Sequence, residues 1–343
     1  MMSRCAAQLL RRFVLAGLGL IGCAIVVVVL STMYQAIATA KEQARFPIPG
    51  KLVDVGGYRL HLRCEGMGNP TVVFESGFGM SSNEWALVQP EVTRSTRTCT
   101  YDRTGYGWSD SGPTADSVEV LHVLLRKAGI SAPYIMVGHS YGSGLVRRYA
   151  HRFPDDIAGI VLTATSYPDE EWHRKAADSS DGDRRLLQKY AWTTRVGLLR
   201  IMPERLLSEM FRVYFGLLRR YLPKQAAESE IAFLHQTRHV QSLVLEADHP
   251  NDIEEAEDRA ACSKGFGSLP LVVLTERWVY SAAADPEERK EARREEERQR
   301  KLARLSSRGE KIDVDGGHLI PLEHPAVVID AIRRVILTAR EMR

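Results

Sequence analysis

The chain has few cysteines, five in 343 residues, and they follow no regular spacing. Cys5 and Cys23 belong to the N-terminal segment, which leaves Cys64, Cys99 and Cys262 for the rest of the protein. Three cysteines can form one disulfide at most, so a small domain stapled by several disulfides is excluded. Their wide separation also argues against a metal site, and we expect buried free thiols.

The chain also lacks a strong net charge. Its 46 Lys and Arg residues nearly balance its 43 Asp and Glu residues, which gives a formal charge of +3. A protein that binds nucleic acid usually presents a strong basic field, so we expect no nucleic-acid partner. Residues 287–304 are rich in charge, but acidic and basic side chains recur four residues apart, as on a solvated helix.

Charge is absent altogether from residues 13–30, a run of 18 apolar or small residues. A run of this length is typical of a helix that spans a membrane. Arg11 and Arg12 precede the run, and the next charged residue after it is Lys41. The positive-inside rule therefore predicts a single-pass protein with its main body on the exported side.

A cleaved signal peptide is the alternative interpretation of this segment. Ala38, Thr39 and Ala40 could form a small-residue cleavage site, which would release the body as a secreted protein. The apolar run is longer than the usual core of a signal peptide, and the cleavage site lies well downstream of it. We therefore favour a retained anchor and linker over residues 1–45, followed by one domain over residues 46–343.

The body carries a regular series of strand patterns separated, from the third onward, by helical segments. A pair of glycines, Gly56 and Gly57, joins the first two strands as a hairpin. The later strands are short and apolar, as in a buried parallel sheet. The predicted strands cover residues 51–55, 59–64, 71–75, 96–102, 134–138, 159–163, 269–275 and 311–315. These patterns predict an α/β fold with eight strands, of which the second is antiparallel.

A long insertion follows the sixth predicted strand. It contains helical patterns, such as the amphipathic residues 206–221, and no strand pattern. A segment of this length without strands indicates a helical cap, which we expect over about residues 165–268.

The most informative motif is Gly-His-Ser-Tyr-Gly at residues 138–142. It matches the G-x-S-x-G pattern, in which a sharp turn between a strand and a helix exposes a serine. An apolar strand pattern precedes it, and a helical pattern over residues 143–151 follows it. The glycines are needed because neighbouring chain passes so close that a Cβ at either position would clash. Ser140 is therefore a candidate nucleophile.

Two further motifs stand in the same chain. Asp102 to Ser109 read D-R-T-G-Y-G-W-S, and Gly316 and Gly317 precede His318 after the last predicted strand. With the serine motif between them, they resemble the α/β-hydrolase fold family, whose members carry D-R-x-G-x-G-x-S after the fourth strand. The resemblance covers the body from about Lys51 onward. It implies that the second strand lies beside the fourth, which would make Cys64 and Cys99 neighbours.

The resemblance also assigns roles to individual residues. A serine hydroxyl needs a base to remove its proton during attack, and His318 occupies the family's position for that base. The oxyanion that forms needs backbone N–H donors. Tyr141, which follows the nucleophile, would supply one, and Phe78, in the glycine-rich loop after the third strand, would supply the other. We expect His139 to make local contacts and His324 to begin a helix.

The acid that would orient His318 is left open. In this fold it usually follows the strand predicted at residues 269–275, where Glu276 ends the strand and Asp285 lies in the next loop. A second known location follows the preceding strand, but Ala164 stands there, with Asp169 a few residues later. We rank Asp285 first, Glu276 second and Asp169 third.

Together these residues predict a membrane-anchored serine hydrolase of an ester or similar acyl bond, which needs no metal or organic cofactor. The apolar faces of the cap helices suggest a small hydrophobic acyl substrate. Dehalogenases and epoxide hydrolases of this fold need aspartate at position 140, so they are disfavoured. Two alternatives remain: another reaction of the same triad, such as C–C bond hydrolysis, perhydrolysis or acyl transfer, or a non-catalytic binding protein of this fold.

Overall fold

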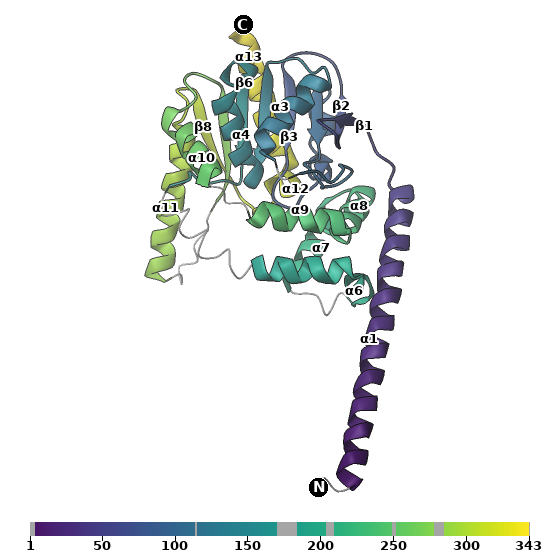
Figure 1. Cartoon of the computed structure of the whole chain (residues 1–343). Helices are drawn as coiled ribbons and strands as arrows, with labels where there is room; N and C mark the ends of the chain where they lie inside the picture. Colours follow the sequence, from purple (N-terminus) through teal and green to yellow (C-terminus); the bar gives the residue numbers. More distant parts are fainter. Residues whose placement is uncertain are drawn as a thin grey trace.

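An eight-stranded sheet with helices on both faces forms the centre of the computed structural model, which describes residues 4–113, 115–169, 184–203, 209–248, 252–277 and 285–342 (Figure 1). The strands are β1 (Lys51–Asp54), β2 (Arg59–Glu65), β3 (Thr71–Glu75), β4 (Thr98–Tyr101), β5 (Tyr134–His139), β6 (Ile157–Thr163), β7 (Leu271–Glu276) and β8 (Gly309–Val314). Their order is β1-β2-β4-β3-β5-β6-β7-β8, and β2 runs antiparallel to both of its neighbours. All eight predicted strands and the antiparallel second strand are confirmed.

The helices were predicted less completely than the strands. They are α1 (Arg4–Arg45), α2 (Gln89–Val92), α3 (Ser117–Lys127), α4 (Tyr141–Arg152), α6 (Leu198–Ile201), α7 (Glu209–Tyr221), α8 (Lys224–Leu234), α9 (Thr237–Asp248), α10 (Asp252–Lys264), α11 (Pro286–Ala303), α12 (Ile320–Glu323) and α13 (Pro325–Glu341), with 3-10 turns η1 (Ser82–Trp85) and η2 (Pro154–Asp156). Residues 184–195 are also helical.

The central strands are apolar throughout because both of their faces are covered. Every residue of β3 and β5 is buried. Alternate side chains enter two separate cores, so that Val73 and Met136 pack toward α3 and α4, whereas Val72 and Ile135 pack toward α2 and α13. This two-sided burial explains why the strand patterns lack polar alternation.

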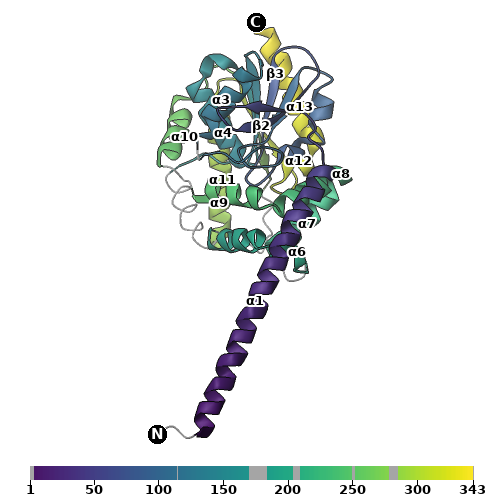
Figure 2. The ribbon, with the colours of Figure 1, turned by 45° about the vertical axis from the view of Figure 1, so that its right-hand side comes forward.

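The described residues between β6 and β7 contain helices and no strand, as predicted for the insertion. Residues 184–195 and α6 to α9 gather beyond one end of the sheet, on the side toward which α1 projects (Figures 1 and 2). Helix α10 instead returns to the sheet and packs on α4, where Arg147 and Asp258 form a buried ion pair at 2.6 Å. We call residues 184–248 the cap.

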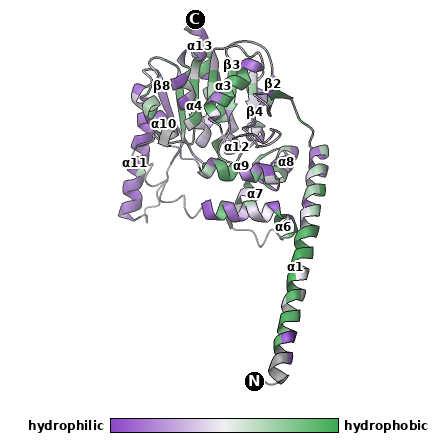
Figure 3. Ribbon diagram, in the orientation of Figure 1, coloured by the Kyte–Doolittle hydropathy of each residue, from purple (hydrophilic) through white to green (hydrophobic). Residues whose placement is uncertain are grey.

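Helix α1 is continuous over 42 residues, and among the described residues it is the one helix long and apolar enough to cross a membrane. Its apolar part projects away from the body, and its more polar C-terminal part lies against the cap (Figures 2 and 3). Ser31 Oγ donates to Val196 O at 2.5 Å, and Gln35 Nε2 donates to His235 O at 2.7 Å. Glu42 forms an ion pair with Arg200 at 2.5 Å.

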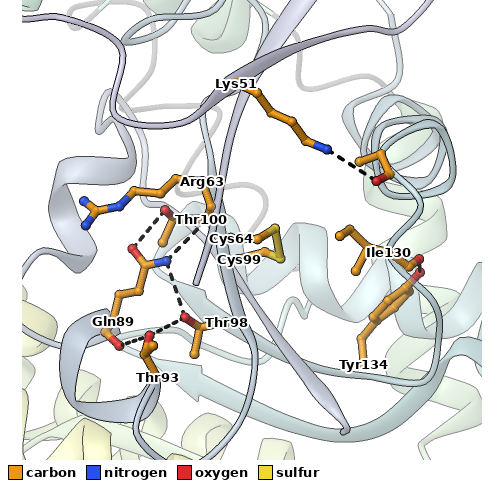
Figure 4. Close-up of a disulfide and its surroundings, with 11 residues drawn as sticks. Lys51, Arg63, Cys64, Gln89, Thr93, Thr98, Cys99, Thr100, Ile130 and Tyr134 are labelled. Carbon is orange, nitrogen blue, oxygen red and sulfur yellow. Dashed lines mark hydrogen bonds between the residues drawn. A yellow bond between two sulfur atoms is a disulfide. The ribbon is translucent and has the colours of Figure 1, made fainter. Parts of the chain in front are cut away.

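Cys64 and Cys99 form a disulfide between β2 and β4 (Figure 4). They face each other in the register of these two strands, with their Cα atoms 4.1 Å apart. The expectation of free thiols was therefore wrong for this pair, because adjacent antiparallel strands bring the two cysteines within bonding distance. Cys262 is buried as a free thiol, as expected.

Candidate active site

Ser140 lies at the turn between β5 and α4 and has a strained backbone, with φ of 51°. Both flanking glycines are needed there. A Cβ at Gly138 would lie 2.7 Å from Ser143 Cα, and one at Gly142 would lie 2.5 Å from Glu75 O. The predicted close approach at both glycines is confirmed, and it holds the serine at the carboxyl end of the central strand.

His318 lies between Ser140 and a carboxylate. Its Nε2 is 2.8 Å from Ser140 Oγ, and its Nδ1 is 2.8 Å from Glu276 Oε1. Since a carboxylate only accepts hydrogen bonds, Nδ1 carries the proton and donates to Glu276. With the proton on Nδ1, the ring presents the lone pair of Nε2 to the serine hydroxyl, which donates to it.

This geometry reverses the ranking of the acids. Asp285, ranked first, accepts hydrogen bonds from the N–H groups of Glu287 and Glu288 and so begins α11 as its N-cap. Asp169, ranked third, pairs with Arg298 at 2.9 Å. Glu276, ranked second, is the carboxylate that contacts His318, because it ends β7 beside the loop that follows β8.

The environment of Glu276 favours its charged form. Burial alone would raise the pKa of this carboxyl, but the hydrogen bond from His318 and the nearby imidazoles of His318 and His139 lower it overall. Glu276 is thus an anion at neutral pH. Its side chain is 16% exposed and that of His318 57%, so the pair is accessible to water from the histidine side.

A second histidine, His139, supports the loop of His318 from behind. Its Nε2 donates to His318 O at 2.8 Å, and its Nδ1 lies 2.5 Å from Glu84 Oε1 in a buried ion pair. Burial would lower the pKa of His139, but the charge of Glu84 and the two contacts raise it overall. Since a carbonyl and a carboxylate are both acceptors, both contacts favour the protonated ring. The expected local role of His139 is confirmed.

The sequence interpretation did not identify Glu84. It lies 55 positions before His139 and belongs to the short turn η1, and no local motif points to it. Its second oxygen accepts from Gly77 N at 2.8 Å. Glu84 therefore ties the loop after β3 to the histidine beside the nucleophile.

The loop after β3 also has its carbonyl groups fixed. Arg103, from the D-R-x-G-x-G-x-S motif, donates to Ser76 O at 2.7 Å and to Gly77 O at 2.9 Å. In a trans peptide the N–H points opposite to the C=O, so the N–H of Phe78 points away from Arg103. The rings of Phe78 and Tyr141 meet edge to face at 6.3 Å, so the two residues predicted as amide donors are neighbours in the structure.

The cap contacts the same loop region. Ser81 N donates to Glu230 Oε1 of α8 at 3.0 Å, and the Ser81 hydroxyl donates to the other oxygen. Burial raises the pKa of Glu230 to about 7, although the hydrogen bonds from Ser81 and Asn83 oppose the shift. In the described part of the chain, no group of three or more His, Cys, Asp or Glu side chains could hold a metal ion.

Comparison with known proteins agrees with this fold. A family model for the alpha/beta hydrolase fold matches residues 70–196, which include the Ser140 turn. A proposed epoxide hydrolase from Pseudomonas aeruginosa superposes with a TM-score of 0.62 at 18% identity, over 85% of this chain and 96% of its own. The chain has the α/β-hydrolase fold.

Sequence relatives of this α/β-hydrolase-fold protein match over shorter segments. The uncharacterized protein YqjL of Bacillus subtilis is 37% identical over 117 residues, which cover 33% of this chain and 46% of YqjL. The 2-hydroxy-6-oxo-2,4-heptadienoate hydrolase of Pseudomonas putida is 32% identical over 120 residues, covering 33% of this chain and 43% of that enzyme. The chain spans about half or less of the curated relatives it matches, for example 19% and 54% of two others.

Proposed function

We propose that the protein is a membrane-anchored serine hydrolase that cleaves an ester or similar acyl bond of a small hydrophobic substrate. The observation that carries the proposal is the line of contacts from Ser140 Oγ through His318 to Glu276, with both hydrogen bonds at 2.8 Å. A nucleophile, a base and an acid that orients the base are the three groups this chemistry needs.

In the proposed reaction, Ser140 Oγ attacks the substrate carbonyl carbon and gives its proton to His318 Nε2. Glu276 stabilises the imidazolium that results. When the tetrahedral intermediate collapses, the bond to the leaving alcohol breaks and His318 returns the proton to it. Water then attacks the acyl-enzyme by the same route and releases the acid.

The N–H groups of Phe78 and Tyr141 would stabilise the oxyanion. The N–H of Gly77 is already bound to Glu84, and that of Phe78 is directed away from Arg103, which supports Phe78 as the donor from this loop. Tyr141 follows Ser140 directly and begins α4, which is the position of the other donor in this type of turn. No step of this mechanism requires a metal or an organic cofactor.

The serine at position 140 argues against epoxide hydrolysis through an alkyl-enzyme ester, because that chemistry needs a carboxylate nucleophile. The likeness to the Pseudomonas aeruginosa protein, at 18% identity, concerns the fold alone. A second candidate follows from the similarity to 2-hydroxy-6-oxo-2,4-heptadienoate hydrolase, namely use of the same triad on a carbon–carbon bond.

Contacts of α1 support a retained anchor with an exported body. Arg200 contacts Thr39 at 3.4 Å and Glu42 at 2.5 Å, so cleavage after Ala40 would separate two residues of α1 that both contact the cap. The Cys64–Cys99 disulfide agrees with an oxidising compartment, since disulfides are rare in the cytosol.

A fluorophosphonate probe tests the nucleophile. We expect the folded full-length protein to be labelled and the Ser140→Ala variant to be unlabelled. Ser143→Ala is the control, because Ser143 lies one turn away and its hydroxyl donates to Thr163 O. Labelling that persists in Ser140→Ala, or its absence from folded wild type, contradicts the serine mechanism and favours a non-catalytic binding protein.

Substrate panels test the reaction class. Release of alcohol and acid from p-nitrophenyl esters, without cleavage of dienoate carbon–carbon bonds, is the expected product pattern. Membrane anchoring is tested separately by fractionation with an alkaline wash. The full-length protein should stay in the membrane pellet, and a shortened soluble protein would contradict the anchor.

A further inference from the structure

The apolar part of α1 ends where the cap begins. Leu30 is the last residue of the apolar run, and the next residue, Ser31, donates its hydroxyl to Val196 O at 2.5 Å. The backbones are in contact here, because a Cβ at Gly197 would lie 2.0 Å from Ser31 O. If residues 13–30 span a bilayer, residues around 196 lie at its surface.

The helix at residues 184–195 has one buried and one exposed face. Leu187, Tyr190 and Thr194 are buried, and the Tyr190 hydroxyl donates to Leu234 O at 2.8 Å. The opposite face is exposed. It carries Arg185, Gln188, Lys189, Trp192 and Arg195. In Figure 1 this helix lies at the lower edge of the cap and leads into α6, which is next to α1.

The composition of this exposed face suits a lipid surface. Residues 184–203 contain five basic residues and no acidic residue. Arg200 is paired with Glu42 of α1, whereas Arg185, Lys189 and Arg195 are exposed. Trp192 is 58% exposed and Ile201 of α6 is 52% exposed. Tryptophan and basic side chains are the residues enriched at the boundary between lipid and water.

We propose that this face, which we call the cap underside and define as Arg185, Lys189, Trp192, Arg195 and Ile201, rests on the anionic headgroups of the bilayer that α1 spans. Trp192 and Ile201 enter the headgroup layer, and the three basic side chains contact lipid phosphates. The partner is the lipid surface because the cap underside is continuous with the end of the apolar run. The proposal depends on the membrane anchoring proposed above and not on the reaction.

This placement bears on the substrate. The cap contacts the segment after β3 through Glu230 and Ser81, so the part of the body that carries Ser140 would lie close to the lipid surface. A substrate dissolved in the bilayer would then be delivered beside the cap. The proposed hydrophobic substrate would thus come from the bilayer itself.

The test uses the full-length protein in phosphatidylcholine vesicles with or without phosphatidylglycerol. In a Cys5→Ser, Cys23→Ser background, an environment-sensitive fluorophore is attached to Gln188→Cys on the exposed helix face. The matched control is Met67→Cys, which is 84% exposed and adjoins Gly68 near Arg340, at the other end of the body. Lipids that carry a quencher near the headgroup report contact.

We expect quenching at position 188 in the anionic vesicles, several-fold less without phosphatidylglycerol or at high salt, and little at position 67. Replacing Arg185, Lys189 and Arg195 together by Gln should abolish the dependence on phosphatidylglycerol, while fluorophosphonate labelling of Ser140 reports that the variant is folded. Two results overturn the proposal. The first is equally weak quenching at positions 188 and 67 in protein that floats with the vesicles. The second is equal quenching at position 188 in vesicles with and without phosphatidylglycerol. Failure to float overturns the anchoring itself.

Discussion

The Glu276→Gln substitution examines the acid of the site in isolation. It preserves the length and shape of the side chain and removes its charge. In the wild type, Glu276 Oε1 lies 2.8 Å from His318 Nδ1, and its pKa is lowered by the histidine despite the opposing effect of burial. The amide of glutamine can instead donate to Nδ1, which would place the ring proton on Nε2, facing Ser140. In that tautomer the histidine cannot accept the serine proton.

The expected loss has two contributions. The imidazolium formed during attack loses an opposite charge at about 4 Å, which is worth about 1 kcal/mol in water and about 4 kcal/mol near a protein surface. Since the His318 side chain is 57% exposed, we take the lower half of this range, about 1–2 kcal/mol, or roughly 5- to 30-fold in rate. The tautomer with its proton on Nε2 lowers the rate further. The total loss of rate can then approach about 10⁴-fold, which is the loss of kcat when the aspartate of a serine triad is replaced by asparagine.

The measurement is the second-order rate constant for fluorophosphonate labelling, together with kcat/KM for a p-nitrophenyl ester. The matched control is Asp285→Asn, at the acid that the sequence favoured. Asparagine is also a good N-cap, so both rate constants should match wild type. Asp285→Ala should reduce stability by about 1 kcal/mol through the lost cap and leave the rate constants unchanged.

The opposite pattern would refute the assignment. If Asp285→Asn lowers the labelling rate and Glu276→Gln does not, the contact of Glu276 with His318 is not the one used in the reaction. A fall in both variants with equal loss of thermal stability would show that the rates report unfolding. Circular dichroism melts in the same buffer separate that outcome from a chemical effect.

Three further predictions concern the surroundings of the site. Glu84→Gln breaks a buried pair and should cost about 3–5 kcal/mol of unfolding free energy. Because the pKa of His139 is raised, the stabilisation by the pair is complete below its ordinary value of 6.5 and is lost as pH rises through the raised value. Denaturant melts at several pH values should show this decline in wild type and not in the variant. The pKa of Glu230 is raised from 4.5 to about 7 in the folded protein. The free energy of unfolding of the wild type should therefore fall as pH rises from 4.5 to about 7. Glu230→Gln should remove that fall in the same melts. Gly197→Ala adds a methyl group at φ of 75° in contact with α1, and it should lower the melting temperature through a loss of at least about 1–2 kcal/mol of unfolding free energy. The control is Gly216→Ala on α7, where a Cβ meets nothing within 4 Å. This substitution should raise the melting temperature slightly.

The sheet could be predicted from sequence because each strand is a short apolar run between turn residues, and burial on both faces produces that pattern directly. Ser140 and His318 could be predicted for a related reason. Each follows a strand at the same edge of the sheet, so chain order alone brings them to one place. The pairing of Cys64 with Cys99 needed the strand order as well, which the fold family implied but no local pattern encodes.

The acid could not be predicted because two nearby carboxylates have different local roles. Asp285 stands before Pro286, with glutamate at position 288, and this is the signature of a helix N-cap. This pattern indicates the capping role of Asp285, but no local pattern assigns Glu276 to His318. Glu276 contacts His318 from the end of β7. Its register partner in β8 is Val314, which lies four positions before the histidine. The glutamate side chain, one methylene longer than that of aspartate, spans the remaining distance.

Helix α8 connects the anchor to the active site. At its C-terminal end, His235 O accepts from Gln35 of α1 at 2.7 Å, and in its middle Glu230 accepts from Ser81 N at 3.0 Å. Ser81 precedes η1, which contains the Glu84 that binds Gly77 and His139. A displacement of α1 relative to the cap must therefore break the contact with His235 or move α8, and moving α8 strains the segment that holds the loop after β3. Because α8 is fixed at both of these points, the position of α1 is coupled through α8 to the segment beside Ser140.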